Sequence, residues 1–149
     1  MVKFITKSPS ETKKLAKSLL KEILKNKKSK KAVLIALSGS LGSGKTTFLK
    51  GLAEALEIKE NVFSPTFLII KKYKIKSKKF KIKNFFHIDC YRIEDPEQIL
   101  KLGFKEMISN SQNLIAIEWA QKIKNILPKD IFWLKFKIIS KNFRQITFL

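Results

Sequence analysis

The chain contains a single cysteine, Cys90, and this scarcity excludes several kinds of site. One thiol cannot form an internal disulfide, and a zinc site built from several cysteines is excluded as well. The only histidine, His87, has no second histidine or cysteine cluster to join it. We therefore interpret His87 as a hydrogen-bonded strand residue rather than a metal ligand. The low cysteine content is typical of a protein of the reducing cytoplasm.

Long apolar runs are also missing. No run approaches the roughly 20 residues that a membrane-spanning helix requires, and the first residues, Met1-Val2-Lys3-Phe4, lack the apolar stretch of a secretory signal. We expect a cytoplasmic protein that makes no membrane contact. With 149 residues, 44% of them hydrophobic, and no internal repeat or Gly/Ser linker, the chain is expected to form one domain over residues 1–149.

Acidic residues are few: 12, against 32 basic residues, which gives a net charge of +20. Such a charge attracts nucleic acids and anionic protein surfaces. However, Arg92 and Arg144 are the only arginines, and arginine is better suited than lysine to bidentate recognition of bases and phosphates. Two interpretations stay open, namely attraction to RNA and a lysine-rich composition without a binding role.

Hydrophobic periodicity predicts an α/β protein. A short strand at the start is followed by a helix with Ser8 as N-cap and Pro9 in its first turn, running to about residue 25. The apolar run 32–37 is typical of a strand covered on both faces, and a helical stripe extends from about 45 to 57. Further on, the pattern predicts a helix from Pro96 to Gly103, a strand over 114–117, a short helix to Leu127, and strands over 131–139 and 145–149.

Residues 67–88 are predicted to form two antiparallel strands. Tyr73 and Ile75 alternate with lysines in the first, and Phe80 and Ile82 do so in the second. Eight lysines fall within Lys71–Lys83. These lysines either form a solvated sheet edge that discourages edge-to-edge pairing, or they bind RNA or an acidic partner.

The segment Gly39–Thr46, of sequence GSLGSGKT, matches the P-loop pattern G-x-x-x-x-G-K-[ST] in full. Its glycines allow successive backbone N–H groups to surround a phosphate, and the following helix directs its positive end at the same anion. Lys45 can reach the β- and γ-phosphates, and the Thr46 hydroxyl can bind Mg²⁺. A buried strand before the loop and an amphipathic helix after it are the context that this motif requires.

A P-loop also needs an acidic residue to hold the magnesium ion or its waters, usually at the end of an apolar strand. Two residues qualify: Glu118, at the end of 114–117, and Asp89, at the end of 85–88. We assign Glu118 to the metal and Asp89 to the hydrolytic water or to the waters around the metal. The opposite assignment, and pairing of either carboxylate with a surface lysine, stay open.

Residues 64–67, of sequence SPTF, follow the P-loop helix after a short connection. Pro65 restricts the residue before it to an extended conformation, so this loop is expected to be stiff. A threonine at position 66 could sense the γ-phosphate as a switch loop does; the alternative is an ordinary turn that enters a strand.

Together these segments resemble the TsaE family of small bacterial ATPases, which are required for threonylcarbamoyladenosine modification of tRNA. The P-loop alone is shared with many unrelated families. The more specific signatures are SPTF at 64–67, HIDCYR at 87–92 and IEWA at 117–120, in the order and spacing of the family. The likeness extends from the helix start at Ser10-Glu11-Thr12 to Arg144.

The resemblance implies a three-layer α/β fold of the P-loop NTPase type, with a mixed parallel and antiparallel central sheet. It implies ATP and Mg²⁺ as cofactors, and weak hydrolysis that depends on TsaD- and TsaB-like partners. The implied catalytic residues are Lys45 and Asp89, and the implied metal residues are Thr46 and Glu118. The implied nucleotide-binding residues are Thr12, Gly42, Ser43, Gly44, Lys45, Thr46, Thr47 and Arg144. The long lysine-rich segment 71–83 departs from the family pattern, which leaves its contact with tRNA or with a partner open.

Two other functions are compatible with parts of the sequence. A small-molecule kinase would use the same P-loop, but kinase lids commonly employ several arginines and an acceptor domain for which this chain has little spare length. A basic RNA-binding module would explain the charge and leave the P-loop without a role. Hydrolysis or nucleotide-gated switching therefore fits the residues better.

Overall fold

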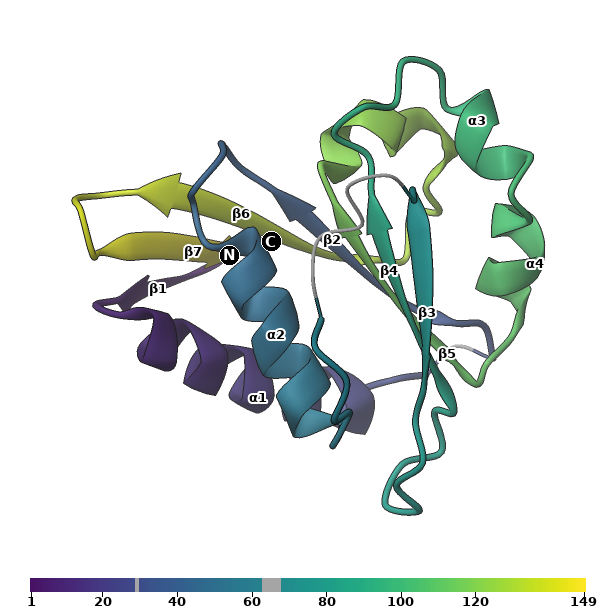
Figure 1. Ribbon diagram of the computed structural model, residues 1–149, viewed down its shortest axis with the longest axis horizontal. Helices are drawn as coiled ribbons and strands as arrows, with labels where there is room; N and C mark the ends of the chain where they lie inside the picture. Colours follow the sequence, from purple (N-terminus) through teal and green to yellow (C-terminus); the bar gives the residue numbers. More distant parts are fainter. Residues whose placement is uncertain (29, 63–67) are drawn as a thin grey trace.

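The computed structural model describes residues 1–28, 30–62 and 68–149. Within these residues a seven-stranded sheet has the order β1-β7-β6-β2-β5-β4-β3 (Figure 1). The strands are β1 (Val2–Thr6), β2 (Val33–Ser38), β3 (Ile70–Lys74), β4 (Asn84–Asp89), β5 (Asn113–Glu118), β6 (Phe132–Ile138) and β7 (Arg144–Phe148). The helices are α1 (Pro9–Lys25), α2 (Lys45–Ala55), α3 (Glu97–Leu100), α4 (Phe104–Ser109) and the 3-10 helix η1 (Ala120–Ile126).

The middle of the sheet is parallel and its edges are antiparallel. Strands β6, β2, β5 and β4 run in the same direction, whereas β3 pairs antiparallel with β4, and β7 pairs antiparallel with both β6 and β1. The predicted mixed sheet is confirmed. In this register Leu37 and Asp89 are both paired with Glu118, so the carboxyl ends of β2, β4 and β5 meet at one edge.

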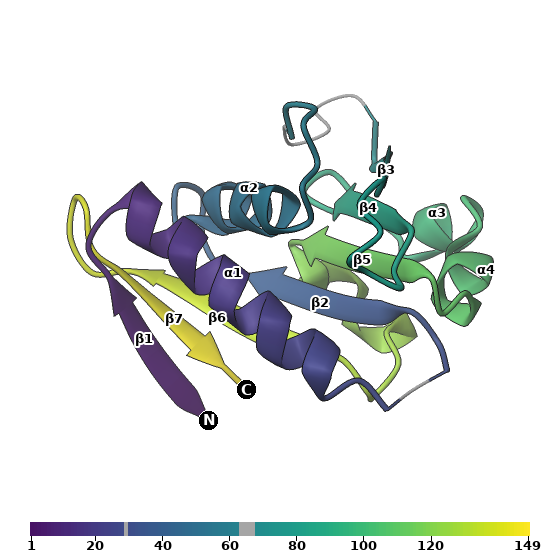
Figure 2. The ribbon, with the colours of Figure 1, turned by 90° about the horizontal axis from the view of Figure 1, so that it is seen from below.

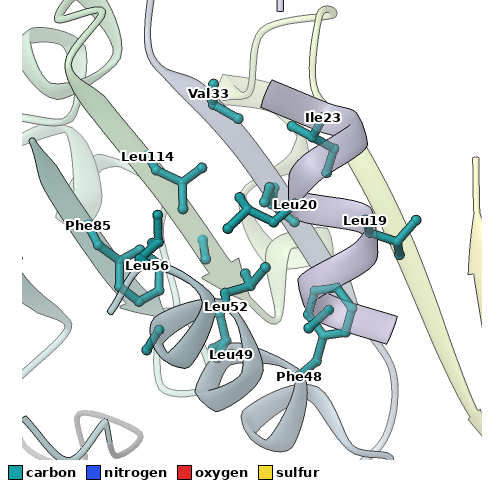
Figure 3. Packing of buried hydrophobic residues seen from close by; sticks show 14 of the residues in the cluster. Leu19, Leu20, Ile23, Val33, Phe48, Leu49, Leu52, Leu56, Phe85 and Leu114 are labelled. Carbon is teal, nitrogen blue, oxygen red and sulfur yellow. The ribbon is translucent and has the colours of Figure 1, made fainter. Parts of the chain in front are cut away.

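Alternate residues of β2 face two separate hydrophobic clusters. Val33, Ile35 and Leu37 pack with α1 and α2, while Leu34 and Ala36 pack with apolar residues of α3, α4 and η1. Figure 2 shows α1 and α2 side by side along the sheet, and Figure 3 shows their leucines meeting the strands. A strand buried on both faces explains why the run 32–37 has no polar residue.

Helix α1 begins where its capping residues predict. The Ser8 hydroxyl accepts a hydrogen bond from the Glu11 N–H at 3.2 Å, which satisfies one of the unpaired N–H groups of the first turn. The Glu11 carboxylate in turn accepts from the Lys7 N–H at 2.6 Å. This cap fixes the entry from β1, and it places the first turn of α1 beside the P-loop.

The second strand of the predicted lysine-rich hairpin begins later than expected. Strand β4 starts at Asn84, and both Phe80 and Ile82 lie in the connection that precedes it. The connection is closed by the Ile75 N–H, which donates to the Lys83 carbonyl at 2.8 Å. The N–H groups of Lys83 and Asn84 both donate to Gln112, so the position of β5 determines where β4 can begin.

The helix predicted from Pro96 to Gly103 is shorter than expected, and another helix follows it. Helix α3 ends at Leu100, and Gly103, with a φ of 87°, separates it from α4, which the sequence analysis did not predict. Both bury apolar side chains against the sheet, among them Ile99 and Phe104. None of the helices in the described ranges is both long and apolar enough to cross a membrane.

Candidate functional site

A cavity of about 720 Å³ opens where the carboxyl ends of β2, β4 and β5 meet the N-terminal turns of α1 and α2. Ligands of open α/β sheets bind at this edge. All the residues that the sequence analysis assigned to the site line this one cavity: Thr12, Gly42, Ser43, Gly44, Lys45, Thr46, Thr47, Asp89, Glu118 and Arg144. The motif at 64–67 lies outside the described residues.

The backbone of the P-loop adopts conformations that favour glycine. Gly39 and Gly44 have φ values of 146° and 102°. A Cβ atom on Gly39 would lie 2.6 Å from the Phe136 carbonyl oxygen, so the loop passes too close to β6 for any side chain at that position. Gly44 is the N-cap of α2, and no side chain of the described residues caps the helix there. Its first N–H groups are therefore suited to bind an anion.

The ammonium group of Lys45 is held inside the loop. Its Nζ atom donates to the carbonyl oxygens of Gly39 at 2.6 Å and Ser40 at 2.8 Å. The same atom lies 4.4 Å from the ring centroid of Trp119. Burial lowers the pKa of Lys45, and the carboxylates of Glu118 and Asp89 oppose that shift. The cation is thus positioned at the base of the cavity, between the loop and two acidic strand ends.

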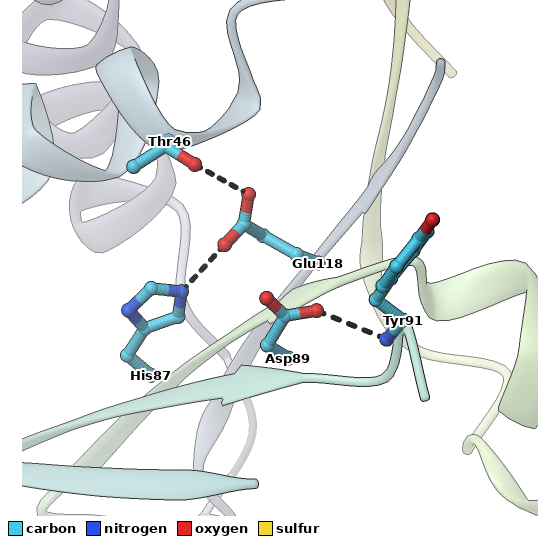
Figure 4. A network of polar contacts seen from close by, with 5 residues as sticks. All are labelled: Thr46, His87, Asp89, Tyr91 and Glu118. Atoms are coloured by element: carbon cyan, nitrogen blue, oxygen red, sulfur yellow. Dashed lines mark hydrogen bonds and ion pairs between the residues drawn. The ribbon is translucent and has the colours of Figure 1, made fainter. Parts of the chain in front are cut away.

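Glu118 joins the P-loop helix to β4 (Figure 4). Its Oε1 atom accepts from the Thr46 hydroxyl at 2.9 Å, and its Oε2 atom lies 2.7 Å from Nε2 of His87. The Glu118 side chain is 4% exposed and that of His87 is buried completely. Because a carboxylate can only accept, Nε2 of His87 carries the proton of this hydrogen bond when Glu118 is ionised.

Asp89 lies beside Glu118 but has a wetter environment. Its Oδ1 atom accepts from the backbone N–H of Tyr91 at 3.0 Å, which orients the carboxylate at the end of β4 (Figure 4). Burial raises the pKa of Asp89, the Tyr91 hydrogen bond partly offsets this, and the nearby charge of Glu118 adds to the rise. A half-buried carboxylate with a raised pKa is a better proton acceptor than an exposed one.

The residues around Thr46 suit a magnesium ion better than a metal held by protein ligands alone. The described part of the chain has no cluster of three His, Cys, Asp or Glu side chains that could hold a metal. The Thr46 hydroxyl and the Glu118 carboxylate are oxygen ligands that lie in contact. Mg²⁺ is usually bound through one or two carboxylates, with phosphates and water supplying the other positions.

Thr12 and Arg144 both line the cavity, and each is next to Thr6 of β1: Arg144 is its partner across the β1–β7 pair, and Thr12 contacts its hydroxyl. Thr12 is buried, and its hydroxyl lies 2.8 Å from that of Thr6. Nε of Arg144 donates to the Gly42 carbonyl at 3.1 Å, and its Nη1 atom donates to three carbonyls of the β6–β7 turn. Thr12 is thus tied to β1 and Arg144 to the P-loop, and both border the cavity.

Three further residues contribute to the site: His87, whose interpretation as a hydrogen-bonded strand residue is confirmed, and Tyr91 and Trp119, which received no separate role in the sequence analysis. His87 orients Glu118, and it lies two positions before Asp89, on the same face of β4, which is the signal that could have revealed it. Tyr91 and Trp119 pack together with ring centroids 5.1 Å apart. Trp119 has a φ of 58°, a left-handed conformation that is uncommon outside glycine. No sequence signal indicated that its ring would lie against Lys45.

Comparisons with known proteins match most of the chain to one family. The family model described as threonylcarbamoyl adenosine biosynthesis protein TsaE matches residues 6–146. A Rickettsia prowazekii protein named tRNA threonylcarbamoyladenosine biosynthesis protein TsaE is 38% identical over 138 residues, which are 92% of this chain and 87% of that protein. The Haemophilus influenzae protein of the same name is 35% identical over 108 residues, 72% of this chain and 65% of the relative.

A solved structure supports the fold as well. The crystal structure of Bacillus subtilis YdiB has 34% sequence identity to the chain and a TM-score of 0.73, with 99% of this chain and 83% of that one covered. The family match spans most of the chain and includes the P-loop and both acidic strand ends. The chain belongs to the TsaE family of threonylcarbamoyl adenosine biosynthesis proteins.

Proposed function

We propose that the chain binds ATP with Mg²⁺ in the cavity between the P-loop, Asp89 and Glu118, and that it hydrolyses the nucleotide. The observation that carries the proposal is the contact between the Thr46 hydroxyl and Glu118, 2.9 Å apart, in the same cavity as the Lys45 ammonium. It joins the first turn of the P-loop helix to an acidic strand end, which is what a magnesium-dependent nucleotide site requires.

The loop residues would bind and orient the phosphates. Backbone N–H groups of the P-loop and of the first turn of α2 supply hydrogen-bond donors without a competing side-chain cap among the described residues. Lys45 exchanges its hydrogen bonds with the Gly39 and Ser40 carbonyls for contacts with phosphate oxygens. Arg144, anchored on the Gly42 carbonyl, would contact the nucleotide from the β6–β7 side.

The oxygen atoms of Thr46 and Glu118 would hold the magnesium ion, which neutralises charge on the phosphates when it is bound. His87 keeps the Glu118 carboxylate aimed at Thr46 by donating to its second oxygen. Asp89, held by the Tyr91 N–H, would accept a hydrogen bond from the attacking water and receive its proton. Burial, which raises the pKa of Asp89, makes it a stronger base for this step.

We propose that this activity serves threonylcarbamoyladenosine modification of tRNA, the process named for the relatives of the chain. TsaD- and TsaB-like proteins are the proposed partners, and turnover by the chain alone is proposed to be weak. Its only two arginines, Arg92 and Arg144, both line the cavity, but Arg144 is already bonded to backbone carbonyls. If a partner protein completes the site, ATP hydrolysis by the chain without that partner is expected to be slow.

The experiment that tests the proposal measures phosphate release from ATP as Mg²⁺ is titrated, for the wild type and for Glu118→Gln. The amide keeps the size of the side chain and the hydrogen bond to His87 but loses the charge that holds the ion. We expect hydrolysis to fall by about 10²-fold or more, in keeping with the loss of a group that stabilises transition-state charge.

Glu106→Gln is the matched control, because Glu106 is an exposed glutamate on α4, remote from the cavity. Its hydrolysis rate should equal that of the wild type. Equal rates for Glu118→Gln and Glu106→Gln at limiting Mg²⁺ would contradict the assignment of Glu118 to the metal. Absence of Mg²⁺-dependent hydrolysis in the wild type, both alone and with TsaD- and TsaB-like proteins, would contradict the function itself.

A further inference from the structure

A second cavity, of about 990 Å³, lies at the end of the sheet opposite the nucleotide site. It is bounded by the second half of α1, by the β3–β4 connection and by the residues just before β5; Figure 1 shows this connection extending past the sheet. We call it the lysine groove. Its lining residues are Lys17, Leu20, Lys21, Leu24, Lys25, Lys27, Lys30, Ala55, Lys79, Phe80, Lys81, Ile82, Ser111 and Gln112.

The floor of the lysine groove is apolar. Leu20 and Leu24 come from successive turns of α1, Ala55 from the last turn of α2, and Phe80 and Ile82 from the β3–β4 connection. Leu20 and Ile82 are buried, whereas Leu24, Ala55 and Phe80 are half-buried. The floor therefore continues the hydrophobic core to the surface and leaves apolar area for a ligand to cover.

The rim of the lysine groove carries one sign of charge. Seven of its lining residues are lysines and none is acidic. Lys79 forms an ion pair with Glu57 at 3.1 Å, and Lys27 donates to the Ser111 carbonyl at 2.8 Å. Within the described ranges, no other rim lysine has an ion pair. Burial lowers the pKa of Lys27, so this lysine already bears a cost of desolvation.

The lysines are arranged in two walls. On α1, Lys17, Lys21 and Lys25 recur every four residues, which puts like charges one turn apart on a single face. Lys79 and Lys81 form the facing wall, on the β3–β4 connection. Neighbouring positive charges of this kind destabilise a helix unless an anion compensates them, so the arrangement favours an occupant with negative charges along both edges.

We propose that the lysine groove binds an acidic amphipathic segment of a partner protein. The apolar side of the segment covers Leu24, Ala55 and Phe80, and its carboxylates face the lysines on both walls. A helix with apolar residues at i, i+3, i+4 and i+7 and acidic residues beside them has this pattern. The proposal concerns a surface at the far end of the sheet and goes beyond the nucleotide chemistry.

An aliphatic floor favours such a segment over RNA. Single-stranded nucleic acids bind by stacking bases on several aromatic side chains, and among the residues that the structure describes Phe80 is the only aromatic one that lines the groove. Double-stranded RNA is held through phosphates and 2′-hydroxyls and gains nothing from an apolar floor. The rim also contains no arginine, the residue best suited to phosphates. The groove, with lysines beside leucines, is instead complementary to a segment with carboxylates beside apolar side chains.

The test measures fluorescence anisotropy with a labelled helical peptide of about four turns, in which leucines form one stripe and glutamates occupy the other positions. A scrambled peptide of the same composition has the same charge without the stripe. A single-stranded RNA of equal charge is the third probe. Titrations are made at near-physiological salt without nucleotide, so their result is independent of ATP binding. The protein variants are Lys21→Glu/Lys25→Glu, Leu24→Ala, and the control Lys105→Glu/Lys137→Glu, whose lysines are exposed and lie outside the groove.

We expect the striped peptide to bind the wild type at least about tenfold more tightly than the scrambled peptide or the RNA. Lys21→Glu/Lys25→Glu and Leu24→Ala should each weaken that binding by a similar factor, and the control pair should not. Circular dichroism and thermal unfolding verify that the groove variants are folded. Equal binding of the scrambled peptide, or tighter binding of the RNA, would overturn the proposal. An effect of the control pair equal to that of the groove pair would also overturn it.

Discussion

Nε2 of His87 lies 2.7 Å from Oε2 of Glu118, and neither side chain is more than 4% exposed. This buried contact fixes the orientation of the carboxylate that also accepts from Thr46. Nδ1 of His87 has no hydrogen-bond partner among the described residues, so Nε2 makes the only hydrogen bond of the ring there. Among the described residues, the hydrogen bond that ties the histidine to the site is therefore the one to Glu118.

Replacing His87 should alter the requirement for magnesium. In His87→Ala the buried carboxylate loses one donor, and removal of a hydrogen bond that orients a metal ligand typically lowers metal affinity about 10–100-fold. We expect the Mg²⁺ concentration for half-maximal hydrolysis to rise accordingly. His87→Gln, which retains a side-chain donor, should restore part of the affinity. A Mg²⁺ dependence identical in wild type and His87→Ala would show that the contact does not position Glu118.

Asp89→Asn should raise the stability of the fold and lower ATP hydrolysis. Burial raises the pKa of Asp89, so the folded state holds the proton of this group more tightly than the unfolded state does. Protonated Asp89 therefore stabilises the folded state at low pH, and this contribution is lost as pH rises through the raised pKa. At pH 7 the ionised carboxylate destabilises the fold. The neutral amide should therefore raise Tm in thermal unfolding, while ATP hydrolysis falls by about 10²–10⁴-fold with the loss of the base.

The raised pKa of Asp89 also predicts how the rate of hydrolysis changes with pH on the acid side of its profile. Hydrolysis needs the ionised carboxylate, so the rate should decline as pH falls through a pKa above 3.8, the ordinary value of the group. Far-ultraviolet circular dichroism over the same range separates this titration from acid unfolding. A Tm of Asp89→Asn below that of the wild type at pH 7 would contradict the burial argument.

Two glycines of the P-loop should differ in their tolerance of alanine. A Cβ atom at Gly39 would lie 2.6 Å from a backbone oxygen and 2.8 Å from Ser43 Oγ, whereas one at Gly42 would meet nothing within 4 Å. Gly42→Ala bears only the strain of a φ of 73°, about 1–2 kcal/mol. Gly39→Ala must also displace β6 or the loop. Denaturant unfolding should show a larger loss in the free energy of unfolding for Gly39→Ala than for Gly42→Ala. Equal losses would contradict the close approach of Gly39 to β6.

Cys90 should be inert in the native protein. Its side chain is fully buried, and burial, aided by the charge of Asp89, raises its pKa to about 12. Because the thiolate is the reactive form, the thiol stays protonated and unreactive from pH 5 to about pH 9. Labelling by a thiol reagent at pH 8 should be at least about 100-fold slower in the native state than in denaturant. Rapid native labelling would show that the end of β4 opens.

The core of the site could be predicted from the sequence because its signals are local. The apolar run before Gly39, the glycine spacing and the helical stripe after Lys45 each involve neighbouring residues, and β2, the P-loop and α2 form where they indicate. Glu118 and Asp89 were identified because each follows an apolar strand. Parallel pairing of β4 with β5 then brings the two together at one edge.

Features that depend on distant segments could not be predicted. The start of β4 is set by hydrogen bonds to Gln112, which the alternation of Phe80 and Ile82 does not reveal. Helix α4 forms because Phe104 and Met107 pack under the sheet, although it has only six residues. The lysine groove needs α1 and the β3–β4 connection side by side, and no pattern within either segment indicates the other.

The central claim is that the loop Gly39–Thr46 binds the phosphates of ATP through Lys45. Isothermal titration calorimetry of MgATP into the wild type, Lys45→Ala and the exposed-lysine control Lys105→Ala tests it most directly. We predict saturable binding for the wild type and for Lys105→Ala, and a loss of at least about tenfold in affinity for a folded Lys45→Ala. Equal affinity of Lys45→Ala and the wild type would contradict the account.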